Sequence, residues 1–196
     1  MNDRLPRAVA LAALAALAVS CTGNAAAPVA TPAVTSAAVR TAADWQYRPP
    51  QEFDSLPSVP DSAFVKLIRS GVAKGDLPAT AVGTSYLSAD QTRQISIRAV
   101  PQHNTDPAGA LDVLLRKELP NDDMRTHYAD ADPGERGGAM RCGSIRDDDG
   151  TVNVLCFWSD GSMVGIYGEY VRGADLGIDQ AADHARAFRG LAEVPS

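Results

Sequence analysis

Two cysteines, Cys142 and Cys156, constrain the fold of this 196-residue chain more than any other feature. The segment Asp147–Gly150 lies between them and separates two strand-like runs. Its glycine suits the left-handed position of a three-residue hairpin loop formed by residues 148–150. In the register that this loop sets, Cys142 lies directly opposite Cys156. Facing residues of an antiparallel pair have Cα atoms about 4.5–5.5 Å apart, which suits a disulfide.

This pairing is interpreted as a structural disulfide. The same register places Trp158 opposite Met140, on the face of the hairpin that carries the cysteines, so the disulfide is expected in the core. The alternatives are a redox-active pair and a metal site. Redox cysteines favour close C-x-x-C spacing and a lowered thiol pKa, and nothing in the sequence supplies either. Closing a loop of this length stabilises a fold by roughly 3 kcal/mol in the chain-entropy model.

The N-terminus is typical of a secretory signal peptide. Two arginines within residues 2–7 precede an apolar run, Ala8–Val19, which would span only about 18 Å as a helix. A bilayer core of roughly 30 Å needs a longer segment. The exit Leu17–Cys21 resembles the lipobox of bacterial lipoproteins, with Ala18 where leucine is more usual. The resemblance implies a signal peptide over residues 1–20, cleavage before Cys21, diacylation of its sulfur, and attachment to the outer face of the cytoplasmic membrane.

The segment after Cys21 is expected to be a linker. Residues 22–44 consist mainly of Ala, Thr, Pro, Val and Ser and contain no aromatic residue. They cannot bury enough apolar surface to offset their ordering entropy, so residues 21–44 are predicted to be a lipid-anchored disordered tether with a reach of roughly 25–30 Å. The alternative is ordinary signal cleavage near Ala25–Ala27, which would leave a secreted protein. In either case the cysteine pair lies in an oxidising compartment.

Residues 45–196 are predicted to form one α+β domain in the order α-β-β-α-β-β-β-α. The periodicity favours an antiparallel sheet with helices packed on one face, and one hairpin disulfide. The helices are expected from an Asp61 or Ser62 cap to Gly75, from Asp106–Pro107 to Pro120, and over 178–194. The strands are expected at 81–87, 93–100, 139–146, 151–159 and 163–171, and residues 121–138 are expected to be a surface loop.

Three predicted helices carry apolar positions at helical spacing. Those of the first helix are Phe64, Val65, Leu67, Ile68 and Val72. The stripe of the second helix consists of Leu111, Leu114, Leu115 and Leu119. The inner face of the last helix is expected to consist of Ala181, Ala185, Phe188, Leu191 and Ala192.

Four short segments resemble a family of actinobacterial envelope proteins. They are Pro133–Gly138, Met140–Gly143, Cys156–Asp160 and Val164–Gly165. The family pattern is P-G-x-x-G-G-x-x-x-C-G…C-x-W-x-D…G followed by a helix with an arginine, and the likeness covers about residues 80–194. Its members are uncharacterised lipoproteins or membrane proteins without an assigned reaction, and they usually have alanine at the position of Ser159. The resemblance therefore implies an envelope location and supports the disulfide, but implies no substrate.

The composition argues against several functional classes. A net charge of −6 disfavours a protein that holds nucleic acid by bulk charge, and three histidines leave little material for a metal centre. No G-x-S-x-G, H-E-x-x-H or Walker A motif occurs. His103, His127 and His184 are expected to be exposed polar residues. The acidic alternation of Asp130, Asp132 and Glu135 is calcium-like, but it lacks the EF-hand pattern and is expected to be a solvated loop.

One candidate binding surface remains, Trp158 and Asp160 with the following Gly161. Their competing interpretation is a core tryptophan followed by a turn to Met163. The sequence predicts no catalytic residue, no metal and no cofactor. The expected function is a non-enzymatic, lipid-anchored module that binds an unknown protein partner or envelope component and no nucleic acid. The alternatives are a carrier of a small apolar ligand and, third, a hydrolase using carboxylates such as Asp90, Asp160 or Glu169.

Overall fold

The computed structural model describes residues 45–146, 152–174 and 176–196. These residues belong to a compact unit assigned to Arg40–Ser196. The predicted signal peptide, the linker with Cys21, and the predicted loop 148–150 lie outside the described residues. None of the described helices is long and apolar enough to span a membrane.

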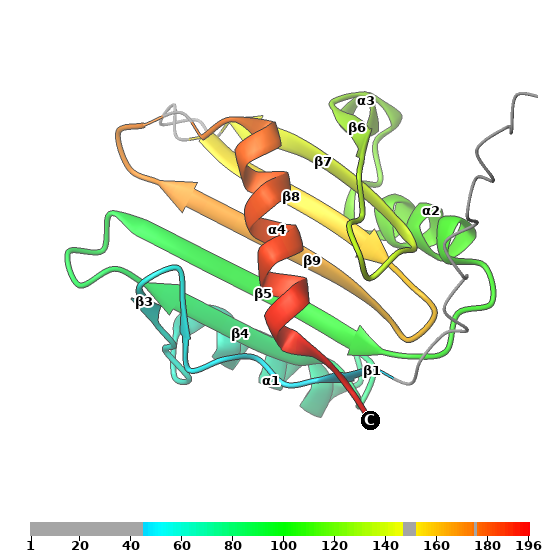
Figure 1. Cartoon of the computed structure of the whole chain (residues 1–196), viewed down its shortest axis with the longest axis horizontal. Helices are drawn as coiled ribbons and strands as arrows, with labels where there is room; N and C mark the ends of the chain where they lie inside the picture. The colour runs from blue at the N-terminus through cyan, green and yellow to red at the C-terminus, as the bar shows by residue number, and fades with distance from the viewer. Residues whose placement is uncertain (1–44, 147–151, 175) are drawn as a thin grey trace, which may run out of the picture. The chain divides into compact units, whose positions relative to one another are not determined.

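The fold is built on a six-stranded antiparallel sheet (Figure 1). The strand order is β4 (Val82–Leu87), β5 (Arg93–Pro101), β9 (Met163–Val171), β8 (Val152–Ser159), β7 (Ala139–Arg146) and β6 (Tyr128–Ala131). Two short hairpins accompany it. One pairs β1 (Trp45–Tyr47) with β10 (Glu193–Pro195), and the other pairs β2 (Glu52–Phe53) with β3 (Leu56–Pro57). The predicted α+β class and the order of the main elements are confirmed.

Local sequence signals set the bounds of the main helices. In α1 (Ala63–Lys74) the Ser62 hydroxyl accepts the N–H of Val65 at 3.2 Å, and Gly75 ends the helix in the left-handed conformation. In α2 (Pro107–Glu118) the Asp106 carboxylate accepts the N–H of Gly109 at 3.0 Å. Gly75 and Asp106 were predicted from the sequence, and Ser62 was one of the two residues expected to cap α1. A further helix, α4 (Ile178–Ala192), follows the sheet.

The placement of the helices differs from the prediction, because they cover both faces of the sheet. Helix α4 crosses one face, while α1 and α2 lie on the other (Figure 1). The reason is visible in β8, where Cys156 packs towards α4 and the neighbouring Phe157 packs towards α2. Successive side chains of a strand point to opposite faces, so a strand that is apolar on both sides needs cover on both.

Two smaller expectations are also wrong. Residues 121–138 are not only loop, since they contain the short helix α3 (Asp122–Thr126) and the edge strand β6. Leu191 is 56% exposed, because it lies on the outer side of α4. The other members of the predicted α4 stripe, Ala181, Ala185, Phe188 and Ala192, are buried as expected.

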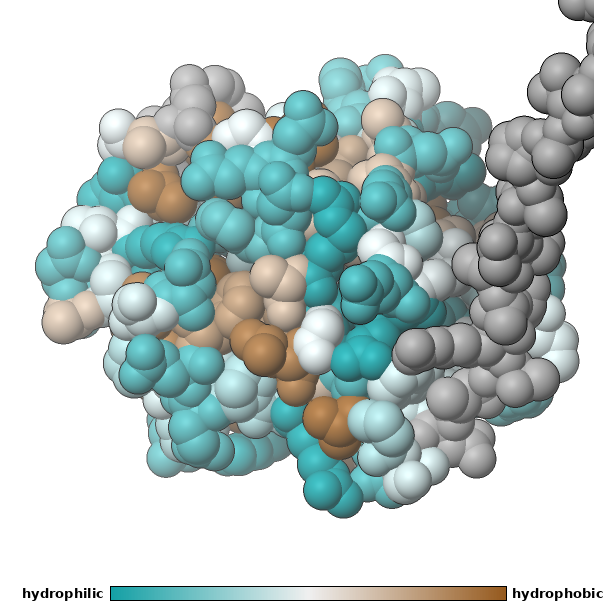
Figure 2. All heavy atoms as spheres, in the orientation of Figure 1, coloured by the Kyte–Doolittle hydropathy of each residue, from teal (hydrophilic) through white to brown (hydrophobic). Residues whose placement is uncertain are grey.

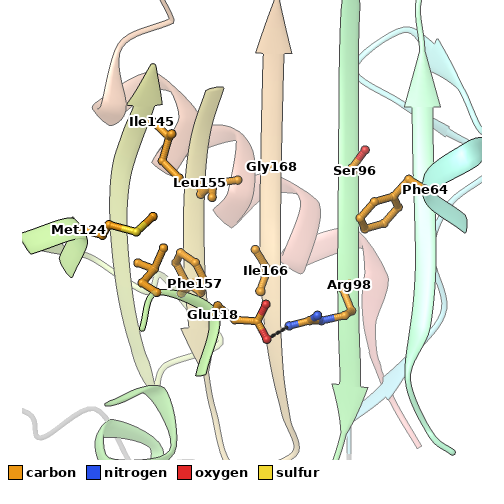
Figure 3. Close-up of a pocket in the computed structure, with 11 residues that line it drawn as sticks. Phe64, Ser96, Arg98, Glu118, Met124, Ile145, Leu155, Phe157, Ile166 and Gly168 are labelled. Atoms are coloured by element: carbon orange, nitrogen blue, oxygen red, sulfur yellow. Dashed lines mark ion pairs between the residues drawn. The ribbon is translucent and has the colours of Figure 1, made fainter. Parts of the chain in front are cut away.

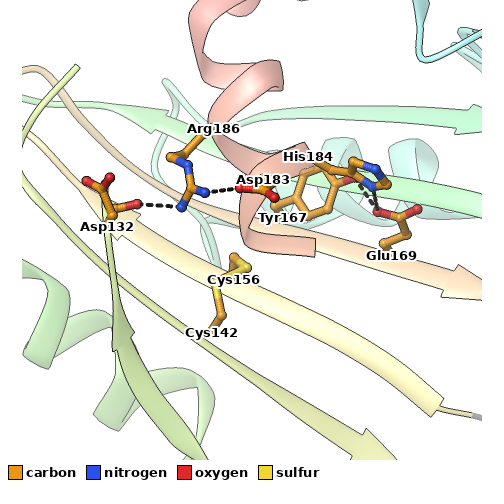
Figure 4. Close-up of a disulfide and its surroundings, with 8 residues drawn as sticks. All are labelled: Asp132, Cys142, Cys156, Tyr167, Glu169, Asp183, His184 and Arg186. Carbon is orange, nitrogen blue, oxygen red and sulfur yellow. Dashed lines mark hydrogen bonds and ion pairs between the residues drawn. A yellow bond between two sulfur atoms is a disulfide. The ribbon is translucent and has the colours of Figure 1, made fainter. Parts of the chain in front are cut away.

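The predicted hairpin register is confirmed. Cys142 pairs with Cys156 and Met140 with Trp158 in the β7–β8 ladder. The two cysteines form a disulfide with a Cα–Cα distance of 4.1 Å, beneath α4 on the core face of the sheet (Figure 4). The disulfide is therefore a link between two central strands rather than an exposed bond.

The core on the α4 side is rich in aromatic rings. Phe188 of α4 lies 5.3 Å from Phe53 in an edge-to-face arrangement and 6.0 Å from Tyr86. Tyr47 of β1 also packs on Phe188, and its hydroxyl hydrogen-bonds that of Thr84 at 3.0 Å. These contacts hold the first described strand against the sheet and the last helix. The outer surface on this side is mainly hydrophilic (Figure 2).

Candidate functional site

The first cluster of charged side chains surrounds Arg189 of α4, which is buried. Its Nε donates to Glu193 at 2.8 Å and its Nη2 donates to Asp160, also at 2.8 Å. Its Nη1 donates to the carbonyl oxygen of Pro133 at 2.8 Å. One guanidinium thus joins α4 to the β8–β9 turn and to the P-G-x-x-G-G segment.

This cluster decides the interpretation of Trp158 and Asp160. Trp158 is 1% exposed and Asp160 is 2% exposed, so the expectation of a binding surface there is wrong. The Asp160 carboxylate accepts the N–H groups of Ser162 and Met163 at 2.7 and 3.0 Å, and thereby shapes the turn. The Trp158 ring lies under the Arg189 guanidinium, 5.8 Å from its central carbon. The competing interpretation, a core tryptophan followed by a turn, is confirmed.

Two glycines within residues 133–165 serve the same cluster. A Cβ on Gly138 would lie 2.0 Å from the carbonyl oxygen of Ser159, and its φ of +88° also favours glycine. A Cβ on Gly165 would lie 2.2 Å from the Trp158 ring. Gly138, Gly165, Trp158 and Asp160 therefore have structural roles, and the charged side chains of the cluster, those of Asp160, Arg189 and Glu193, are buried.

Burial has an electrostatic consequence for this cluster. It raises the pKa of Glu193 from the ordinary 4.5 to about 7, although the Arg189 guanidinium acts in the opposite direction. Arg189 pairs with both carboxylates and Arg136 also acts on Glu193, yet the buried site still accommodates the second negative charge poorly. The raised pKa of this glutamate makes the stability of the cluster sensitive to pH.

A second cluster surrounds Glu169 of β9, whose side chain is fully buried. The Tyr167 hydroxyl donates to it at 2.6 Å, Arg93 donates from Nε at 2.8 Å, and His184 Nδ1 lies 2.8 Å from it. Figure 4 shows the tyrosine, histidine and glutamate side by side between β9 and α4. The expectation that His184 is an exposed polar residue, and that Glu169 is an isolated carboxylate, is wrong.

The Glu169 cluster forms one wall of a depression of about 320 Å³. Asp54 also lines it and pairs with Arg93 at 2.6 Å, so the arginine is shared between two carboxylates. Burial and the neighbouring Glu169 carboxylate raise the pKa of Tyr167, which therefore stays a neutral donor. The described side chains around this depression include no serine, threonine or cysteine that His184 would activate. The arrangement is that of a charge network joining β5, β9 and α4.

A third feature is an apolar groove on the opposite side of the sheet, between α1 and α2 (Figure 3). Its volume is about 290 Å³. The floor is formed by side chains of the central strands, and the walls by Phe64 of α1, Met124 of α3 and Leu119 after α2. The floor residues are Ser96, Arg98, Ile145, Leu155, Phe157, Ile166 and Gly168. Most of these side chains are hydrocarbon and only partly buried.

The polar groups of the groove are gathered on its β5 and α2 edges. Arg98 pairs with Glu118, the last residue of α2, at 2.5 Å. Ser96 lies two residues before Arg98 on the same face of β5, and its hydroxyl accepts the Gln94 side-chain amide at 2.9 Å. An apolar depression with a few convergent polar groups is the usual form of a small-molecule or partner site. The groove is therefore the strongest candidate for a binding site among the described residues.

The remaining residues singled out in the sequence occupy ordinary surface positions. His103 and His127 are exposed. Asp130 pairs with Arg141 at 2.7 Å, Asp132 accepts the N–H of Gly134 at 2.9 Å, and Asp90 closes a turn with Ser88 and Thr92. Within the described ranges, no group of three or more His, Cys, Asp or Glu residues is arranged to hold a metal ion.

No family model, no curated protein and no solved structure matches this chain. The candidate site is therefore defined by its own geometry. Sequence reasoning missed Arg98 and Glu118, although a charged residue in the middle of the alternating strand 93–100 was a signal for the first. It missed the groove itself because the space depends on how far apart two helices lie on one face of the sheet.

Proposed function

We propose that this protein is a lipid-anchored, non-enzymatic binding module of the cell envelope, and that the groove between α1 and α2 is where it binds its ligand. The observation that carries the proposal is the partly exposed apolar floor of the groove. Leu155 and Ile166 lie there within reach of solvent on an otherwise well-packed sheet. Covering such surface releases about 25 cal/mol per Å², which favours an apolar partner.

The setting of the groove supports this proposal. Its floor belongs to β5, β9, β8 and β7, which are consecutive strands of the sheet, so the site is preformed. A preformed apolar groove with one ion pair at its edge suits recognition of an apolar group. Neither of the two charged clusters competes for this role. The charged groups of the Arg189 cluster bond within that cluster, and those of the Glu169 cluster likewise bond within theirs.

The lipid anchor rests on the N-terminal sequence. The short apolar run and the lipobox-like exit at Cys21 support attachment to the outer face of the cytoplasmic membrane. We expect cells grown with an alkynyl fatty acid to yield labelled protein, and a Cys21→Ala variant to lose the label. A Thr22→Ala variant serves as the matched control. A Cys21→Ala protein that still carries label would contradict the anchor, and a freely secreted wild-type protein would favour ordinary signal cleavage.

The groove is tested with a neutral apolar probe. We expect the mature chain, exported behind an ordinary cleavable signal peptide and free of detergent, to bind N-phenyl-1-naphthylamine saturably with one site. An Ile166→Phe substitution adds a ring within the groove and is expected to weaken binding at least tenfold. Leu191→Phe is the matched control, because that residue is exposed on α4 on the other side of the sheet. Fluorescence titration with melting curves for each variant makes the measurement. Absence of saturable binding, or equal binding by the Ile166→Phe variant, would remove the groove as the site.

A further inference from the structure

We propose that the groove holds one alkyl chain of a free fatty acid, with the carboxylate of that ligand bound by Arg98. This inference rests on the proposed function and names the class of ligand. Three observations carry it: the incomplete pairing of Arg98, the arrangement of polar and apolar side chains along the groove, and the size of the space.

Arg98 has fewer acidic partners than three other arginines on the sheet and α4, although the partly exposed Arg186 also pairs with one carboxylate, that of Asp183. Arg93 holds Asp54 and Glu169, and Arg141 holds Asp112 and Asp130. Arg189 likewise holds two carboxylates, Asp160 and Glu193.

Among the described residues, Arg98 pairs with one carboxylate, that of Glu118, through Nη2. A guanidinium has five N–H donors in a planar fork and can take a second carboxylate. The side chain of Arg98 is only 15% exposed, so water replaces that second partner incompletely. Arg98 thus has donor capacity available at the edge of an apolar space.

The side chains of the groove are ordered in the way that an amphiphile requires. Figure 3 shows Ser96 and Arg98 on β5, and Leu155, Phe157 and Ile145 further along on β8 and β7. A carboxylate bound at Arg98 can also accept a hydrogen bond from the Ser96 hydroxyl. Its chain can then cross β9 along Ile166 and over the Leu155 side chain, which fills the space above Gly168. A Cβ at this glycine would already lie 3.0 Å from Leu155.

The charges at the groove favour an acidic head group over a cationic one. Glu118 is 24% exposed and is the last residue of α2, so it can turn towards water while Arg98 stays in place. A cationic head group would be repelled by Arg98, which is less exposed than Glu118 and therefore less able to move away. A neutral head group would forgo the charge-assisted hydrogen bonds, which are roughly twice as strong as neutral ones.

The size of the groove favours a single chain. Its volume of about 290 Å³ is at the lower end of the range for ligand sites, roughly 300–1,000 Å³. A two-chain phospholipid or a sterol needs more space. Each methylene that enters the groove is expected to tighten binding about fourfold until the groove is full, which corresponds to about 0.8 kcal/mol per buried methylene.

The test compares ligands with the same chain and different head groups. The unlipidated mature chain is titrated calorimetrically with decanoate, decanol and decyltrimethylammonium, each below its micelle concentration. We expect decanoate to bind at least tenfold more tightly than decanol, and the cation most weakly. Arg98→Gln is expected to remove the difference between decanoate and decanol. Arg69→Gln is the matched control, since Arg69 lies on the exposed surface of α1 in an ion pair with Asp61.

A second variant keeps the inference falsifiable if Arg98→Gln unfolds. Glu118→Gln frees Arg98 and removes a negative charge, so it is expected to tighten decanoate binding several-fold, a gain that misfolding cannot produce. Equal affinities for decanoate and decanol in the wild-type protein would overturn the fatty-acid inference while leaving the proposed groove function intact. Tighter binding of the cation would overturn it as well. If none of the three ligands nor the neutral probe binds, both proposals are wrong.

Discussion

Replacing Arg189 with methionine is expected to destabilise the fold by about 3–5 kcal/mol at pH 8. The substitution keeps most of the hydrocarbon volume but leaves Asp160 and Glu193 as buried carboxylates without a cation. It also removes the donors to the carbonyl oxygens of Pro133 and Gly137. For a domain of this size the melting temperature should fall by roughly 6–20 °C, measured by circular dichroism or calorimetry.

The loss should be smaller at pH 5 than at pH 8. In the wild-type protein the raised pKa of Glu193, about 7, contributes stability that is fully present below the ordinary pKa of 4.5 and is lost as the pH rises through 7. Without Arg189 the influence that lowers the pKa of Glu193 is lost, so the protonated form of this glutamate is favoured further. At acidic pH, protonation therefore neutralises the carboxylate charge that Arg189 normally offsets. The loss in free energy of unfolding caused by Arg189→Met is smaller for that reason.

Two controls separate this charge effect from a simple packing defect. Adding Asp160→Asn and Glu193→Gln to the Arg189→Met variant should recover part of the stability at pH 8, because the unpaired charges are gone. Arg186→Met changes a partly exposed arginine on the same helix that pairs with the exposed Asp183, and should cost less than about 1 kcal/mol. A loss for Arg189→Met that is equal at both pH values, and is not reduced in the triple variant, would contradict the charge explanation.

The position of Arg189 shows how far the buried charge cluster could be predicted from the sequence. Ala181, Ala185 and Arg189 follow one another at intervals of four on the inner face of α4, and Glu193, the first residue of β10, continues the interval. A charged residue on a stripe that is otherwise apolar signals a buried partner. The identity of that partner could not be predicted, since Asp160 is 29 residues away and only the packing of α4 on the β8–β9 turn brings the two together.

The hairpin register was predictable because the spacing of residues around one turn and the period of two fix it. The packing of helices on both faces of the sheet was harder to predict from the sequence. The run Leu155–Trp158 is continuously apolar rather than alternating, which is typical of a strand buried on both faces. The prediction of helices on one face rested only on the side of that run that carries Cys156. The groove depends on the gap between two helices that pack independently, and no local pattern encodes such a distance.

Replacing both Cys142 and Cys156 with alanine is expected to lower the free energy of unfolding by about 3 kcal/mol. The disulfide closes a loop across a sequence separation of 14, and loss of that constraint enlarges the unfolded ensemble. The small cavity left beside Met140 and Trp158 adds to the cost, because both cysteines are buried in the α4-side core. Denaturant titration of the double variant and the wild-type protein gives the difference.

The same bond should resist chemical attack in the native state. Both sulfurs lie in the closed core on the face covered by α4, so a thiol reductant reaches them only when that region opens. We expect the folded wild-type protein to show no alkylation of Cys142 or Cys156 without reductant, and to show both after reduction in denaturant. Alkylation of both thiols in the exported, unreduced protein would contradict the disulfide. A double variant as stable as the wild-type protein would show that the hairpin register alone, set by its turn and its apolar faces, holds β7 against β8.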